Sequence, residues 1–366
     1  MKFLQPVLAL LILLSSCSPK EAKEEPVSKE EALAFSGKLD SSIRYKLPYL
    51  FNSLINKKVF TDKIAAASGT KVDANIMKGV EDGLKQMDLG QNIIQGIRDN
   101  GFYELVKQYE KNNKQHLLFR LYSDAGLNYH DFELTKRKGE VGIADMYIYL
   151  SGENLSKTLG DLLTSFSELK GDHDSEPYVQ AKAVRKMKEL YQSGEVEEAK
   201  DYYEQLPESL KKQKAIQIMN IQISSKIDDE AHTKAIKSYQ SFYPDEANIN
   251  LLQLDYFITQ RDYKSSMDAI DKLDAMINTD PFLDYIRALV SNLMNEPAQS
   301  ITYLERLHKN MPTYGDGELE LIAHYLDNAD EDKANALIED YKKNEEFDQQ
   351  KLTNYLSSKA DQNGDE

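Results

Sequence analysis

The 366-residue chain has one cysteine, Cys17, and no tryptophan. A single cysteine cannot form a disulfide within the chain, so the folded part must be held together by its own core. Without tryptophan, the chain lacks the ring on which sugar-binding proteins commonly stack their ligands, which counts against a glycan receptor. The apolar run from Val7 to Leu14 is far shorter than the roughly 20 residues that a membrane-spanning helix needs.

Motifs of the common enzyme classes are also missing. The sequence contains no glycine-rich phosphate loop, no nucleophile elbow, no HExxH and no CxxC. His130 and Asp131 are adjacent in a predicted strand, where neighbouring side chains point to opposite faces. Asp172, His173 and Asp174 are consecutive on a predicted loop, so they cannot all face one ion. We therefore expect no catalytic residue, no cofactor and no metal site.

The first residues have the pattern of a signal segment. Lys2 precedes the apolar run, and Ser15 and Ser16 follow it directly before Cys17. The four residues LSSC resemble the lipobox of bacterial lipoproteins. This resemblance implies that residues 1–16 are removed and that the Cys17 thiol carries a diacylglycerol with fatty acids such as palmitate. The alternative is an ordinary secretory signal in which the cysteine lies there by chance.

Residues 17–37 are predicted to form a disordered tether, because Lys, Glu, Ser and Pro dominate them and too little apolar surface is available to offset the ordering entropy. Ser18, in place of aspartate, resembles the pattern of lipoproteins sent to the bacterial outer membrane. The triplet Lys23, Glu24 and Glu25 resembles a signal for export to the cell surface, although a merely charged linker is the alternative. The chain is thus expected to be lipid-anchored and to face the periplasm or the cell surface.

Charge is distributed unevenly along the chain. The formal net charge is −16, and the segment from Pro177 to Glu366 alone has 22 basic and 36 acidic residues, a net charge of −14. Such a surface repels phosphate backbones, so no nucleic-acid partner is expected. It suits an unknown protein partner that is basic.

Residues 38–170 are predicted to be an α+β domain. Helical apolar spacing from Asp40 to about Arg98 gives way to a period of two in residues 102–110, 115–122, 127–136 and 141–150. The turns between these segments are short enough for hairpins, which predicts a four-stranded antiparallel meander with helices on its buried face. The amphipathic stretch 153–169 is expected to join that cover. The order is similar to a cystatin-like or nuclear-transport-factor-like fold, but fold analogy implies no function.

A loop at 171–177 leads to an all-helical second half that contains a repeat. Around Gly194, acidic residues start a helix, and Ala199, Tyr203 and Leu206 follow at helical spacing. This pattern resembles the turn between the two helices of a tetratricopeptide repeat (TPR). The resemblance lacks the family's tryptophan and its leucine-glycine pair, which leaves another α-solenoid or a compact helical bundle as alternatives.

The small residue of this pattern recurs at spacings of 36, 31, 34 and 34, close to the family period of about 34. The recurring positions are Ala199, Ala235, Ser266, Ser300 and Ala334. A small side chain lets the second helix of a pair approach the first, while larger residues four and seven positions later fill the groove. We expect about five TPR-like helix pairs over residues 177–345, followed by a capping helix and tail at 346–366.

The TPR resemblance implies that first helices line a groove for a partner's peptide or helix. Transferred by repeat position, the groove residues would be Lys188, Tyr191, Asn220, Ser224, Asp255, Ile258, Tyr285 and Asn292. The alternative for each is ordinary surface or packing between helices.

The leading hypothesis is therefore a membrane-anchored, noncatalytic scaffold or adaptor that binds a protein partner through the TPR-like groove. One alternative is a small-molecule receptor or an enzyme that acts through the α+β domain. A further alternative is a subunit of an outer-membrane assembly complex.

Overall fold

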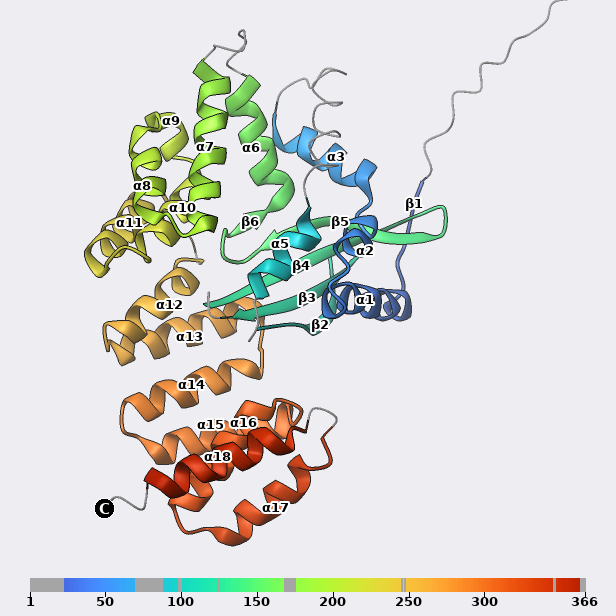
Figure 1. The fold of residues 1–366 in the computed structure, drawn as a ribbon. Coiled ribbons are helices and arrows are strands. Elements are labelled where there is room, and N and C mark those ends of the chain that lie inside the picture. The colour runs from blue at the N-terminus through green and yellow to red at the C-terminus, as the bar shows by residue number, and fades with distance from the viewer. Residues whose placement is uncertain are drawn as a thin grey trace, which may run out of the picture.

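A computed structural model describes residues 23–69, 88–97, 101–123, 126–167, 176–244, 246, 248–344 and 347–362. Cys17, the predicted helical stripe from Ile76 to Met87 and the loop around His173 lie outside these ranges. Within them, a sheet with five helices lies beside a long array of paired helices (Figure 1).

The centre of the sheet is the antiparallel meander β2 (Phe102–Lys111), β3 (Lys114–Ser123), β4 (Gly126–Arg137) and β5 (Glu140–Ile148). Its strands match the predicted segments to within two residues. The β2–β3 turn has positive φ at Asn112 and Asn113, and the β4–β5 turn has positive φ at Lys138 and Gly139. Two successive residues with positive φ give the turn twist that matches twisted antiparallel strands, so these turns fix the pairing register.

The described residues contain two strands more than predicted. β1 (Glu24–Glu25) pairs with the end of β4, and β6 (Glu153–Asn154) pairs with β5. A disordered tether over residues 17–37 is therefore wrong from residue 24 onward. Helix α1 (Lys29–Arg44) starts at a capping box in which Ser28 and Glu31 each bond the other's backbone N–H. Its residues at helical spacing, from Ala32 to Ile43, enter the core beneath the sheet.

One face of the sheet is covered by helices that come before and directly after it in the sequence. These are α1, α2 (Pro48–Ser53), α3 (Lys57–Ala67), α5 (Leu89–Ile97) and α6 (Leu155–Ser167). Alternate sheet residues such as Leu117, Phe119 and Phe132 form a buried core with them. We call these five helices the lid.

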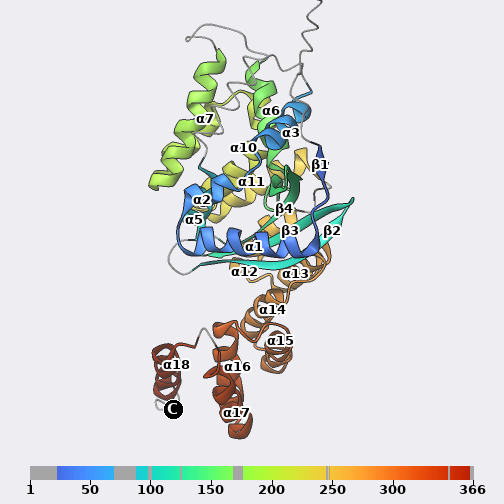
Figure 2. The same ribbon diagram turned by 90° about the vertical axis from the view of Figure 1, so that its right-hand side faces the viewer.

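The opposite face of the sheet is also buried, against the helix array. Leu118 of β3, Leu127 and Tyr129 of β4, and Tyr149 share a core with array residues such as Phe282. Figure 2 shows the lid helices α2 and α5 above the sheet and the array helices α12 and α13 below it. The sequence predicted a cover for only one face, whereas the structure supplies two, because alternate strand residues on both faces are apolar.

The array consists of helix pairs that follow one another along the chain. The pairs are α7 (Glu176–Ser193) with α8 (Val196–Gln205), α10 (Lys214–Ser224) with α11 (Asp229–Phe242), α12 (Ile249–Thr259) with α13 (Tyr263–Ile277), α14 (Phe282–Leu293) with α15 (Pro297–Asn310), and α16 (Gly315–Asp327) with α17 (Glu331–Tyr341). The short helix α9 (Glu208–Lys211) precedes α10, and α18 (Gln349–Gln362) packs on α16. Among the described residues, no helix combines the length and apolarity that crossing a membrane would require.

The small residues of the repeat pattern lie where the two helices of each pair touch. Their exposed fraction is 0% to 2% at Ala199, Ala235, Ser266, Ser300 and Ala334. Most of the larger residues four and seven positions later are buried too, although Phe242 is exposed. The second half is thus TPR-like in the packing of its helix pairs.

This packing predicts that enlarging a repeat residue destabilises the protein. Ala334→Leu places three extra carbon atoms in a fully buried site and should lower the free energy of unfolding by about 1 to 3 kcal/mol. Ala336→Leu, at an exposed position of the same helix, is the matched control and should change it by less than about 0.5 kcal/mol. Urea unfolding of both variants measures the difference, and equal stabilities would contradict the packing.

Candidate functional site

The predicted groove residues do not form one open surface. Lys188 on α7 and Asn292 on α14 are exposed, and Tyr191 beside Lys188 is half-buried. Asn220 and Ser224 on α10 are 2% and 0% exposed, so they do not line an open groove. Asn220 Oδ1 instead accepts a hydrogen bond from Lys200 Nζ of α8 at 2.6 Å, which ties two neighbouring pairs together.

Of the three remaining groove positions, Ile258 and Tyr285 lie in the part of the array that the sheet covers, and Asp255 is exposed beside it. A Cβ atom on Gly126 of β4 would come within 2.5 Å of Asp255 Oδ2, which shows how closely the sheet approaches α12. Ile258 and Tyr285 pack against the core that the sheet and the array share. In the middle repeats, the side of the array where a partner was expected is therefore occupied by the chain's own sheet.

A buried ion pair joins the sheet to the array at this contact. Arg120 of β3 and Asp280, between α13 and α14, are each 2% exposed, and Arg120 Nη1 donates to Asp280 Oδ1 at 2.6 Å. Tyr129 Oη donates to the second carboxylate oxygen at 2.8 Å. Arg120 Nη2 also donates to Glu104 Oε2 at 2.7 Å, and its guanidinium lies 4.4 Å from the ring centroid of Phe282. Asp280 thus accepts from two strands at once.

The surroundings keep Arg120 and Tyr129 in their ordinary protonation states. Burial lowers the pKa of Arg120, but the negative charge of Asp280 and its hydrogen bond outweigh that effect and the pKa is raised overall. Burial, followed by the nearby charge of Asp280, raises the pKa of Tyr129 well above its usual value. Neither group can exchange a proton near neutral pH, so the cluster is suited to holding two layers together and unsuited to acid-base chemistry.

A lysine of the sheet also donates hydrogen bonds to the end of an array helix. Lys107 Nζ of β2 donates to the backbone carbonyls of Ile277 and of Asn278, the latter at 2.7 Å. These carbonyls end α13, where the helix dipole favours a positive charge. Lys107 therefore fastens the edge strand β2 to the C-terminal end of α13, just before Asp280 in the chain.

Leu150, just after β5, lies at the junction of the second and third helix pairs. Its carbonyl accepts from Asn248 Nδ2 at 2.9 Å, and Asn248 Oδ1 accepts from Tyr239 Oη at 2.9 Å. The Leu150 side chain packs against the cores on both sides of this junction. The shortest repeat spacing, 31 residues from Ala235 to Ser266, falls at the same place.

The adjacent His130 and Asp131 point to opposite faces of β4, as strand geometry requires. His130 lies on the lid side, where its Nδ1 is 3.1 Å from Tyr103 Oη and its Nε2 is 3.2 Å from Asn128 Nδ2. Because Asn128 Oδ1 already accepts from two backbone N–H groups, its amide donates to Nε2, and His130 Nδ1–H donates to Tyr103. Asp131 instead accepts from Tyr109 and contacts His116.

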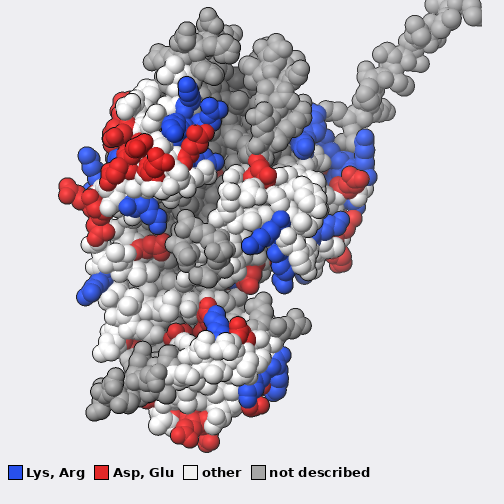
Figure 3. Space-filling model, viewed as in Figure 1, with Lys and Arg blue, Asp and Glu red and all other residues white. Residues whose placement is uncertain are grey.

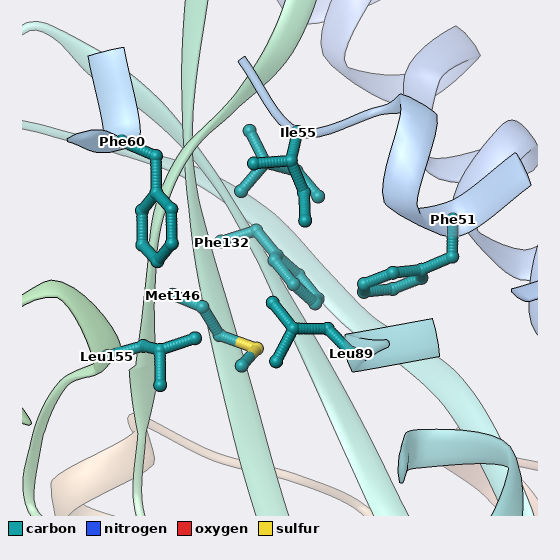
Figure 4. Close-up of a pocket in the computed structure, with 8 residues that line it drawn as sticks. Phe51, Ile55, Phe60, Leu89, Phe132, Met146 and Leu155 are labelled. Atoms are coloured by element: carbon teal, nitrogen blue, oxygen red, sulfur yellow. The ribbon is translucent and has the colours of Figure 1, made fainter. Parts of the chain in front are cut away.

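A small cavity lies between the sheet and the lid and is lined only by apolar side chains (Figure 4). The lining residues are Phe51, Ile55, Phe60, Leu89, Phe132, Ile143, Met146 and Leu155. Ligand sites combine apolar walls with a few convergent polar groups, and this cavity has none among its lining side chains. In the described part of the chain, no group of three or more His, Cys, Asp or Glu residues could hold a metal ion.

Comparison with known proteins shows only a distant structural likeness. No protein-family model matches the chain, and no curated protein matches its sequence. Among solved structures, the chain is similar to MamA 41-end from Desulfovibrio magneticus RS-1, with 14% identity, a TM-score of 0.38, and coverage of 49% of this chain and 96% of that one. A MamA RS-1 ArsTM double mutant gives 13% identity with the same TM-score and coverage. At these values the likeness carries no argument about function.

Sequence reasoning missed the contact between the sheet and the array. The available signal was the segment from Leu117 to Tyr122, in which residues on both faces are apolar and Arg120 stands among them. A strand buried on both faces needs a second cover, and an arginine within it needs a buried acid.

Removing Asp280 should destabilise the protein more than removing one member of a surface ion pair does. Asp280→Ala removes the buried partner of Arg120, leaving it only the half-buried Glu104, and should lower the free energy of unfolding by about 3 to 5 kcal/mol. Glu339→Ala breaks an exposed pair with Lys342 and should cost less than about 1 kcal/mol. Urea unfolding gives both values, and a cost below about 1 kcal/mol for Asp280→Ala would contradict the role of this pair.

His130 should make the protein less stable in mild acid. Burial lowers the pKa of His130 to about 4 from its ordinary 6.5, so the unfolded chain takes up a proton between these pH values while the folded chain does not. The stabilisation that neutral, buried His130 contributes is fully present above pH 6.5 and is lost as the pH falls toward 4. The total loss in the free energy of unfolding is roughly 3 kcal/mol.

Urea unfolding between pH 7 and pH 4 tests this expectation. His130→Gln should remove most of the slope, whereas His173→Gln, at a position outside the described residues, should keep the wild-type slope. An unchanged slope in His130→Gln would refute the assignment.

Proposed function

We propose that this protein is a lipid-anchored, noncatalytic scaffold of the bacterial envelope that binds a protein partner through its helix array. The observation that supports this most is the array itself. Five small residues at near-regular spacing are buried between paired helices, and the sheet fastens the middle pairs through Arg120, Lys107 and Leu150. A fixed array of this kind presents side chains at set positions, which is what recognition of a protein surface requires.

The site for the partner lies away from the middle repeats, because the sheet occupies them. At the N-terminal end of the array, Lys188 remains exposed on α7, and Glu197, Glu198 and Asp201 are exposed on α8. Figure 3 shows acidic side chains concentrated over this part of the molecule. We infer that the partner is basic and contacts α8, since complementary charge speeds association and rejects partners of the wrong sign.

A noncatalytic role fits the chemistry of the described residues. The charged groups buried most deeply are each 2% exposed and are held by partners within the fold; they are Arg120, Asp280, Asp145 and Glu318. The cavity beneath the lid offers no polar lining side chain. These features argue against the receptor or enzyme alternative.

The anchor is the second element of the proposal and rests on the LSSC motif. Lipidation of Cys17 confines the array to the membrane where its partner resides, so that modest affinity is sufficient. A Cys17→Ala protein should lose membrane retention and partner capture together, while its urea unfolding stays unchanged.

Charge reversal on α8 tests the site. Full-length protein carrying Glu197→Lys, Glu198→Lys and Asp201→Lys should capture its dominant crosslinked partner from membranes at least about tenfold less well, because like charges then face each other. The matched control, Glu331→Lys, Asp332→Lys and Glu339→Lys, makes the same charge change at exposed positions of α17 and should capture normally. Quantitative mass spectrometry of the crosslinked product measures both, and equal capture by both variants would overturn the proposed site.

A further inference from the structure

The N-terminal chain joins the fold at the end of the sheet that carries its two hairpin turns. Glu24 and Glu25 of β1 pair with Arg137 and Lys136 of β4. Glu24 Oε1 accepts from Thr135 at 2.8 Å and forms an ion pair with Lys114 at the β2–β3 turn. The chain before residue 24 therefore leaves the folded part beside both turns.

The position of β1 follows from the lengths of the neighbouring strands. β4 extends past the end of β3, so Lys136 and Arg137 have no partner in β3, and β1 takes that place. Glu25 Oε1 also accepts from the backbone N–H of Gly139 in the β4–β5 turn at 3.1 Å. Lys136 Nζ donates to Glu31 of α1 at 2.6 Å, which holds the other end of the segment. Residues 24–31 are thus fixed on the sheet and do not act as a free linker.

Basic side chains project from this end of the sheet. Lys23, Lys111 and Lys138 are exposed, and no ion pair of theirs occurs among the described residues. Of the nearby carboxylates, Glu24 pairs with Lys114 and Glu25 accepts a backbone N–H, while Glu140 at the β4–β5 turn is exposed. Figure 3 shows basic side chains, with acidic ones among them, on the side of the molecule opposite the acidic α8. We call Lys23, Lys111 and Lys138 the basic tip.

We propose that the basic tip contacts the anionic phospholipid headgroups of the membrane that holds Cys17. This inference rests on the proposed lipid anchor. Lys23 is the sixth residue after Cys17, and even a fully extended chain of this length spans only about 20 Å. The face around the chain exit must therefore lie close to the bilayer, and lysines at that distance are attracted by anionic lipid.

The charge asymmetry of the molecule then sets its orientation. The segment from Pro177 onward carries a net charge of −14 and is repelled by the same headgroups that attract the tip. The tip lies against the membrane and the acidic α8 surface points away from it, toward a partner.

A chemical anchor tests this arrangement without depending on lipidation in cells. The chain from Cys17 onward, coupled through its single thiol to a maleimide phospholipid, is placed on vesicles of phosphatidylcholine with or without phosphatidylglycerol. Each lysine is then acylated with a water-soluble ester, and mass spectrometry gives the rate at each position. Lys111 and Lys138 should react about fivefold more slowly on the anionic vesicles, whereas Lys264 and Lys272, exposed on α13, should not change.

Two double variants test whether the positive charge of the basic tip causes the protection. In Lys111→Glu with Lys138→Glu, the remaining reporter Lys23 should lose its protection, while Lys264→Glu with Lys272→Glu should leave Lys23 protected. Equal rates on both kinds of vesicle, or equal protection of the α13 lysines, would overturn the proposal. The intact mass of the protein from cells tests Cys17 lipidation separately, so failure of the anchor and failure of the basic tip are distinguishable.

Discussion

A sheet with apolar side chains on both faces needs two covers, and the rest of this structure depends on how the second cover is supplied. The lid covers one face with helices close in sequence. The other face is closed by helices more than one hundred residues further along the chain. The cost of burying Arg120 within that contact is offset only because Asp280, Tyr129 and Glu104 surround it, which makes the contact specific as well as apolar.

Much of the fold could be predicted because local patterns determine it. The meander follows from alternation and short turns, and the repeat follows from small residues that recur at near-constant spacing. β1 and the start of α1 were missed because residues 24–31 are charged, and composition alone predicts disorder for them. Their order comes from partners distant in sequence, such as Lys114 for Glu24 and Lys136 for Glu31, and no local pattern contains that information.

The predicted groove shows a second reason why sequence patterns mislead. Positions transferred from a repeat pattern assume that the inner side of the array is open, and the pattern of one repeat cannot report what another part of the chain places there. Asn220 and Ser224 are buried, Asn220 accepts from Lys200 of the neighbouring pair, and Asp255 lies against Gly126 of the sheet. Lys188 and Asn292 remain exposed.

The packing of Leu150 between the second and third helix pairs affects how the chain folds. An ordinary solenoid grows from any repeat, because each unit needs only its neighbours. Here the second and third pairs meet around a residue that belongs to the sheet, so that junction cannot mature until the meander has formed. Contacts over such long sequence separations slow folding, and they make one cooperative unit of two halves that would otherwise unfold independently. Damage to either half should therefore unfold the whole protein.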